Sequence, residues 1–125
     1  MRRTILTPNA PSPIGPYAQG VAASGSFLFV SGQIPKDPKT GVMPTDVRGQ
    51  VTQCLKNIQA IVEAAGATLA DVVKVNAYLK DLADFKVYNE VYTTFFAEPY
   101  PARTSVQATP PGCLVEMDAI VLLKP

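Results

Sequence analysis

Two carboxylates interrupt the last apolar run of the chain. Residues 114–123 are mostly aliphatic, and Glu116 and Asp118 stand two positions apart within them, which places both side chains on one face of a strand. A charge in such a strand costs free energy unless it is paired or used. The two carboxylates could form the polar face of an edge strand or an ion pair between subunits. Alternatively, Glu116 is a base held in a partly buried cleft.

Arg103 is the second candidate for chemistry, because prolines stiffen the segment that leads to it. Pro99 and Pro101 precede it, so the root of its side chain should be fixed in place. Arginine binds a carboxylate through two parallel hydrogen bonds. An ordinary surface arginine would show the same pattern, so the sequence leaves both interpretations open.

Other polar groups with potential binding roles are spread along the chain. One candidate is a tyrosine in a rigid turn. Another is a serine at the end of a strand, followed by a glycine whose backbone N–H could bind an anionic or carbonyl group. The last is an asparagine within a helix, where asparagine is a mediocre helix former. Each group also has an ordinary structural interpretation as a core edge, a turn or surface decoration. These candidates are Tyr17, Ser31, Gly32 and Asn89.

Histidine is absent from the 125 residues, and this restricts the chemistry. Its absence excludes Ser-His-Asp and Cys-His catalysis and the usual zinc sites built with histidine. A general base must then be a carboxylate, lysine, tyrosine, cysteine or bound water. Cys54 and Cys113 fit no metal or redox motif, so we expect two reduced thiols in a cytoplasmic protein, with a single disulfide as the alternative.

The composition is that of one globular domain spanning residues 1–125. Hydrophobic residues make up 47% and charged residues 17% of the chain, and the net charge is +1. These values predict a packed core. They give no electrostatic reason to expect nucleic acid or a membrane as a partner, and no apolar run reaches the ~20 residues that cross a bilayer.

Hydrophobic spacing predicts the element order β-β-β-α-β-α-β-β. Three-and-four spacing indicates two helices, the first closed by Gly66 and the second stopped by Pro99. The Ser24-Gly25-Ser26 turn should join the second and third strands as a hairpin. The predicted strands cover 4–6, 18–23, 27–31, 72–80, 104–108 and 114–123, and the helices begin at Thr45 or Asp46 and near Asp81 or Asp84.

This order predicts an α+β fold, a mixed sheet with both helices on one face. The other face of the sheet must also be buried. For so small a chain, self-association is the simplest way to cover it.

Five separate segments together resemble the RidA/YjgF family of reactive-intermediate deaminases. The resemblance covers essentially the whole chain, with the segments in the family's order. It implies a chorismate-mutase-like fold and a homotrimer with three clefts between subunits. It also implies hydrolysis of 2-imino acids and enamines, such as 2-aminoacrylate, to 2-oxo acids and ammonia. The segments are Asn9-Ala10-Pro11, Ile14 to Gly20, Ser31 to Pro35, Pro101 to Ser105 and Val115 to Ile120.

The resemblance also implies roles for single residues. Arg103 matches the arginine that binds the substrate carboxylate, and Glu116 matches the glutamate that holds or activates the attacking water. Gly32 matches a backbone contact to the substrate. Pocket residues are matched by Tyr17, Ser31 and Asn89.

Two positions depart from the family's pattern. Ser105 stands where the deaminating branch often has cysteine, so this chain has a hydroxyl in place of a thiol at that position. We count Ser105 as substrate-binding. Asp118 replaces a common glutamate, and we assign it no catalytic role. Because an imine is already electrophilic, the implied reaction requires neither a metal nor an organic cofactor.

Three alternative functions share this fold or family. A trimer that binds 2-oxo acids without catalysis would keep the same clefts, although the presence of both Arg103 and Glu116 favours an enzyme. An RNA-directed ribonuclease or translation inhibitor is disfavoured by the near-zero net charge. Chorismate mutase is suggested by fold alone, and fold does not determine function.

Overall fold

The computed structural model describes all 125 residues, and its elements follow the predicted order. Two short 3-10 turns, Leu69–Asp71 and Leu82–Asp84, precede β4 and α2 and were not predicted. The strands are β1 (Arg2–Ile5), β2 (Gly20–Ala23), β3 (Ser26–Gln33), β4 (Val72–Leu79), β5 (Ala102–Gln107) and β6 (Val115–Leu123), and the helices are α1 (Val47–Ala64) and α2 (Phe85–Phe95).

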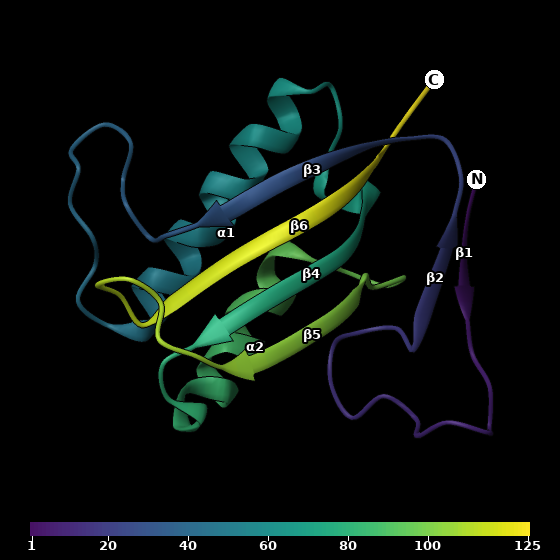
Figure 1. The fold of residues 1–125 in the computed structure, drawn as a ribbon, viewed down its shortest axis with the longest axis horizontal. Helices are drawn as coiled ribbons and strands as arrows, with labels where there is room; N and C mark the ends of the chain where they lie inside the picture. Colours follow the sequence, from purple (N-terminus) through teal and green to yellow (C-terminus); the bar gives the residue numbers. More distant parts are fainter.

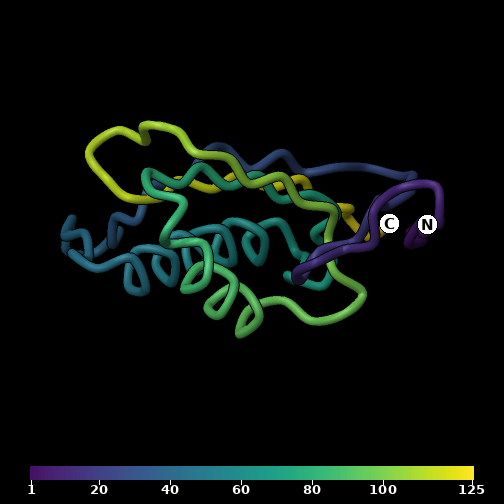
Figure 2. The backbone as a smooth tube through the Cα atoms, turned by 90° about the horizontal axis from the view of Figure 1, so that it is seen from below, coloured from purple at the N-terminus to yellow at the C-terminus, as the bar shows by residue number.

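Four strands form the main sheet in the order β3-β6-β4-β5. The β4 and β5 strands are parallel and the other pairs are antiparallel, so the sheet is mixed. Both helices lie behind the sheet in Figure 1, and the view along the sheet in Figure 2 shows one strand layer over one helix layer. The predicted α+β arrangement is therefore confirmed.

The first helix begins and ends where local chemistry requires. The Asp46 side chain accepts a hydrogen bond from the Gly49 amide at 3.2 Å and caps the helix. Gly66 follows the last turn with φ +81°, a conformation that glycine adopts without strain. One face of the helix is buried against the sheet, by Gln50, Val51, Cys54, Leu55, Ile58 and Val62.

Alternation along β4 and β6 sorts their side chains between two faces. The residues that point to the helices, such as Val75 and Met117, are fully buried. The intervening residues, among them Asn76, Tyr78 and Glu116, are only partly buried. The hydrophobic core therefore lies between the sheet and the helices.

The predicted hairpin between the second and third strands is wrong. The β2 strand pairs only with β1, in a separate two-stranded sheet, while β3 pairs with β6. The segment before β2 is held at the opposite edge of the main sheet, because the Ala18 amide donates to the Pro101 carbonyl at 3.1 Å and Ala18 bridges Ala102. The chain changes direction at Gly25, where φ is +136°.

The strand boundaries at this edge also differ from the prediction. The first strand covers residues 2–5 rather than 4–6, and β5 begins at Ala102 rather than Thr104. Arg2 anchors the first strand, because its guanidinium donates to the carbonyls of Ala70 and Pro99.

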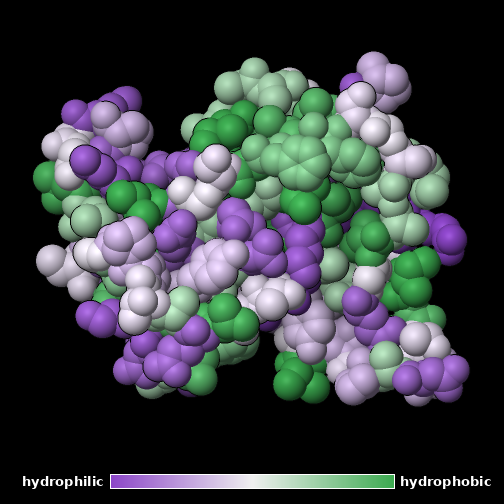
Figure 3. Space-filling view, viewed as in Figure 1, coloured by the Kyte–Doolittle hydropathy of each residue, from purple (hydrophilic) through white to green (hydrophobic).

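No helix covers the second face of the main sheet. Figure 3, viewed as Figure 1, shows an apolar area over β3 beside a polar area over β6 and β4. Phe27 and Phe29 pair there with Leu122 and Ile120, and Phe29 is 73% exposed. We call this surface the open face. Its burial by another copy of the chain stays a prediction.

Candidate active site

Arg103 lies on the edge strand β5 and faces the helix layer. Its ladder partner is Val75, whose side chain is in the core. The Arg103 Nη1 atom donates to Asn89 Oδ1 of α2 at 2.8 Å. Strand and helix therefore hold the guanidinium between them, and two of the predicted residues meet.

Aromatic rings surround this guanidinium. Its Cζ atom lies 4.8 Å from the ring centroids of both Tyr88 and Tyr92, 5.5 Å from that of Tyr17 and 5.7 Å from that of Phe85. Ring faces attract a cation and exclude water from it. The rings therefore fix the position of Arg103 and strengthen its attraction for an anion.

No carboxylate of the chain neutralises Arg103. The structure has two ion pairs, Arg48–Glu90 and Lys124–Asp71, and Arg103 is in neither. Asn89 uses one N–H of the guanidinium, whereas the group carries five donors. The remaining donors are those that a small carboxylate ligand would use.

Ser105 lies two residues beyond Arg103 on the same face of β5. Its hydroxyl is 3.0 Å from the hydroxyl of Tyr88. Burial raises the pKa of Tyr88, and the nearby Arg103 charge and the Ser105 hydrogen bond oppose this rise. Tyr88 is therefore a neutral phenol at physiological pH, able to donate a hydrogen bond.

The loop before β2 closes one side of the Arg103 site. The Tyr17 hydroxyl accepts a hydrogen bond from the Ile14 amide at 3.3 Å, and a methyl group added at Gly15 would lie 3.4 Å from Arg103 Nη2. Gln19 holds the loop. Its side chain accepts from the Thr7 amide and donates to the carbonyls of Thr7, Ala10 and Pro11.

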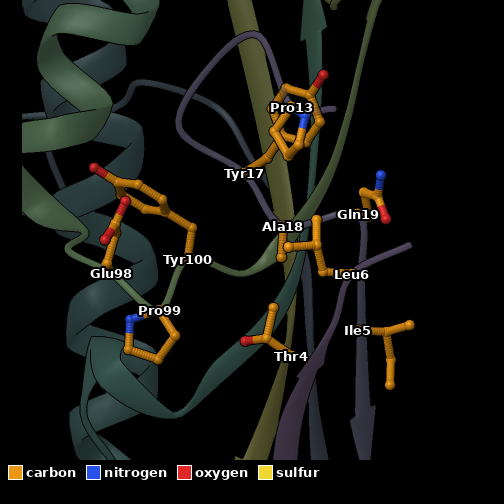
Figure 4. Close-up of a pocket in the computed structure, with 10 residues that line it drawn as sticks. All are labelled: Thr4, Ile5, Leu6, Pro13, Tyr17, Ala18, Gln19, Glu98, Pro99 and Tyr100. Carbon is orange, nitrogen blue, oxygen red and sulfur yellow. The ribbon is translucent and has the colours of Figure 1, made fainter. Parts of the chain in front are cut away.

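A groove of about 540 Å³ runs from Tyr17 along the outside of this loop. Figure 4 shows Pro13 beside Tyr17 at one end, the segment 98–100 on one side and the β1 residues on the other. Arg103 does not line the groove. The groove therefore lies beside the arginine site, and the Tyr17 ring borders both.

Glu116 lies against Gly32, the residue after Ser31, in a second cluster. Two residues, Ser31 and Gly32, stand opposite one residue of β6 in a bulge of the β3–β6 ladder, a distortion that often lies next to active sites. A methyl group added at Gly32 would lie 2.1 Å from Glu116 Oε2. The carboxylate thus lies over the bulge in space that only glycine leaves free.

The two clusters lie on opposite faces of the sheet. Glu116 pairs with Tyr78 across the β4–β6 ladder on the open face, whereas Arg103 faces the helices. One chain brings Arg103 together with Tyr17, Asn89 and Ser105, and does not bring Glu116, Ser31 or Gly32 to them.

Asp118 is hydrogen-bonded to two neighbouring side chains on the open face. It accepts hydrogen bonds from Asn76 Nδ2 at 2.8 Å and from the Tyr78 hydroxyl at 3.1 Å. The bond to Asp118 is the main cause that raises the pKa of Tyr78, followed by burial. Asp118 thus has a structural role in this chain.

The two cysteines are free, and both are buried. Their thiols donate to the same carbonyl, that of Val115, and burial raises the pKa of each. They are therefore poor nucleophiles. No three His, Cys, Asp or Glu side chains gather closely enough to hold a metal ion, and no helix is long and apolar enough to cross a membrane.

Sequence reasoning missed the aromatic residues and Gln19. The spacing of Tyr88, Tyr92 and Phe85 along the second helix is that of a buried helix face, and it does not reveal that their rings also lie next to Arg103. Their helical spacing is the same for both roles, so the pattern gives no separate signal. Gln19 stood inside a predicted motif, yet only the folded loop shows its four hydrogen bonds.

A family model described as Endoribonuclease L-PSP matches residues 7–123 of the chain. A RutC family protein of Pyrococcus horikoshii is 52% identical over 96% of this chain and 97% of its own length. The 2-iminobutanoate/2-iminopropanoate deaminase of Salmonella typhimurium is 47% identical over 98% of each chain. The chain belongs to the RidA/YjgF family. The resemblance seen in its sequence segments is therefore confirmed.

Solved structures of the family have the same fold. RidA from an Antarctic Psychrobacter species superposes with a TM-score of 0.76 at 44% identity and covers 97% of this chain and 99% of its own. TdcF of Escherichia coli, solved with bound serine, gives a TM-score of 0.75 at 43% identity, over 98% of this chain and 99% of its own.

Proposed function

We propose that this RidA/YjgF protein hydrolyses 2-imino acids to 2-oxo acids and ammonia. The observation that carries the proposal is the fixed guanidinium of Arg103, which has no carboxylate partner in its own chain. The deaminases of Salmonella typhimurium and Escherichia coli support it at 47% and 46% identity over 98% of the chain. The serine bound to TdcF is also a small molecule with a carboxylate.

The reaction needs few groups. An enamine tautomerises to the imine, water adds to the C=N carbon, and the tetrahedral adduct expels ammonia to leave the 2-oxo acid. Arg103 would hold the carboxylate through its free N–H groups, and Asn89 would keep the guanidinium in its orientation. A carboxylate base would take the proton of the attacking water and return it to the departing nitrogen.

Glu116 is the proposed base, and it would act in a cleft between subunits. Within one chain, Arg103 and Glu116 occupy opposite faces of the sheet. A second copy packed on the open face would cover Phe29 and bring its own Arg103 to this Glu116. The proposed assembly is a homotrimer with three such clefts, and Ser31 and Gly32 would line each cleft beside Glu116. A cytoplasmic location stays a prediction.

The proposal is tested with a coupled assay. A serine or threonine dehydratase generates the imine, and release of pyruvate or 2-oxobutanoate is followed with and without this protein. The wild type should accelerate release. Arg103→Ala should lower kcat/KM at least about 100-fold, because it removes two charge-assisted hydrogen bonds. The matched control is Arg48→Ala, which removes an arginine from an exposed ion pair with Glu90.

Two results would contradict the proposal. Full activity in Arg103→Ala would show that Arg103 does not bind the substrate carboxylate. No acceleration by the folded wild type, together with binding of 2-oxo acids, would indicate the metabolite-binding alternative instead.

A further inference from the structure

Two hydroxyl groups lie side by side next to the guanidinium of Arg103. The Tyr88 oxygen is 3.0 Å from Ser105 Oγ, and the Tyr88 ring lies 4.8 Å from Arg103 Cζ. The cation and the serine hydroxyl thus both contact the same phenol. Ser105 is also the position at which this chain departs from the common cysteine.

The direction of this hydrogen bond follows from its surroundings. Tyr88 is fully buried, and its hydroxyl lies 3.0 Å from Ser105 Oγ with the Arg103 guanidinium also beside it. A phenol is a stronger donor than an alkyl hydroxyl, and the positive charge of Arg103 repels the phenolic hydrogen toward the serine. Tyr88 therefore donates to Ser105 Oγ. The hydrogen of Ser105 is left free to reach another acceptor.

We infer that Ser105 donates its free hydrogen to the carboxylate that Arg103 holds, and that Tyr88 is the positioning residue that aims it. This inference rests on the proposed function. Ser105 follows Arg103 on the same strand face, about 7 Å along the chain, and the long arginine side chain spans that distance. The acceptor is a carboxylate oxygen, which the 2-imino acid and the 2-oxo acid product share.

A binding measurement with 2-oxobutanoate tests the inference without any need for turnover. Calorimetric titration of the assembled protein should give a dissociation constant that is about 3- to 10-fold weaker for Tyr88→Phe and for Ser105→Ala. The double variant should bind no more weakly than Ser105→Ala alone, because Tyr88 acts through the serine. Ser105→Thr keeps the hydroxyl and should restore binding to near the wild-type value.

Tyr100→Phe is the matched control. Tyr100 packs against the same hydrophobic core, but it lines the groove that Arg103 does not reach. Removal of its hydroxyl should leave the dissociation constant unchanged. Equal weakening by Tyr100→Phe and Tyr88→Phe would show a general effect on packing and would overturn the inference.

The other outcomes separate this inference from the proposed function. Wild-type affinity in Tyr88→Phe, or additive losses in the double variant, would overturn the role of Tyr88 while Arg103 still binds the acid. Equal affinity of the wild type and Arg103→Ala for 2-oxobutanoate would instead contradict the proposed function, and the inference would fail with it.

Discussion

Gly32 determines where the Glu116 carboxylate can lie. The bulge in β3 brings the backbone of Gly32 so close that an added methyl group would lie 2.1 Å from Glu116 Oε2. The glutamate side chain is flexible at its end, so it can move aside at little cost in folding free energy. A larger residue at this position would therefore displace the base without unfolding the chain.

Gly32→Ala should lower kcat roughly 10- to 100-fold, because a small displacement of a catalytic group has effects of this size. The free energy of unfolding should change little. Steady-state kinetics and urea unfolding measure the two quantities. Gly20→Ala is the control, since a methyl group there would lie 3.7 Å from Ile5, an ordinary contact. An unchanged kcat in Gly32→Ala would show that the position of Glu116 does not matter for turnover.

Residue types alone were enough to predict Arg103 and Glu116 as candidates. A charge in an apolar strand and an arginine after two prolines are rare enough to attract attention. The neighbours of Arg103 were not predictable in the same way. Tyr88 and Tyr92 have the spacing of a buried helix face, and a ring that packs in the core can contact a cation with its other side.

At the scale of elements, α2 supplies the aromatic rings around Arg103 and makes the stability of the fold depend on pH in the alkaline range. Burial raises the pKa of both Tyr88 and Tyr92. An unfolded tyrosine has a pKa of about 10, so above this pH the unfolded chain loses protons that the folded chain keeps. The stabilisation is complete below about pH 10 and is lost as the pH rises toward the folded values.

The free energy of unfolding should therefore fall between pH 9 and pH 11. Each buried tyrosine contributes up to about 1.4 kcal/mol per pH unit above its unfolded pKa. The pKa values of Tyr78 and Cys54 are also raised, so these two residues likewise lower the free energy of unfolding as the pH rises. Urea unfolding across this range measures the slope, and Tyr92→Phe should make it shallower. Equal slopes in both proteins would contradict the assignment of Tyr92.

Strong periodicity made most elements predictable. The apolar stripe of α1 and the alternation in β4 and β6 fix their type, their place and the face that each buries. The pairing of β2 was not predictable, because a Ser-Gly-Ser turn permits either a hairpin or a change of direction. Contacts distant in sequence decided between them, above all the bridge from Ala18 to Ala102.

At the scale of the whole molecule, the main fact is the separation of the two clusters. The helix side of the sheet carries Arg103 with Asn89, and the open face carries Glu116 with an apolar area that includes Phe29. Sequence reasoning could name these residues but could not place them on opposite faces, because that depends on the register of three strands. The proposed trimer explains both the separation and the apolar surface.

A mixture of two inactive variants tests this account most directly. Arg103→Ala and Glu116→Gln chains carry different tags, are expressed together and are purified by both tags, so that each trimer contains both. Every mixed trimer then has one cleft with an intact Arg103 from one chain and an intact Glu116 from its neighbour. Such trimers should recover about one third of wild-type activity. No recovery, in trimers that mass spectrometry shows to contain both chains, would contradict a site shared between subunits.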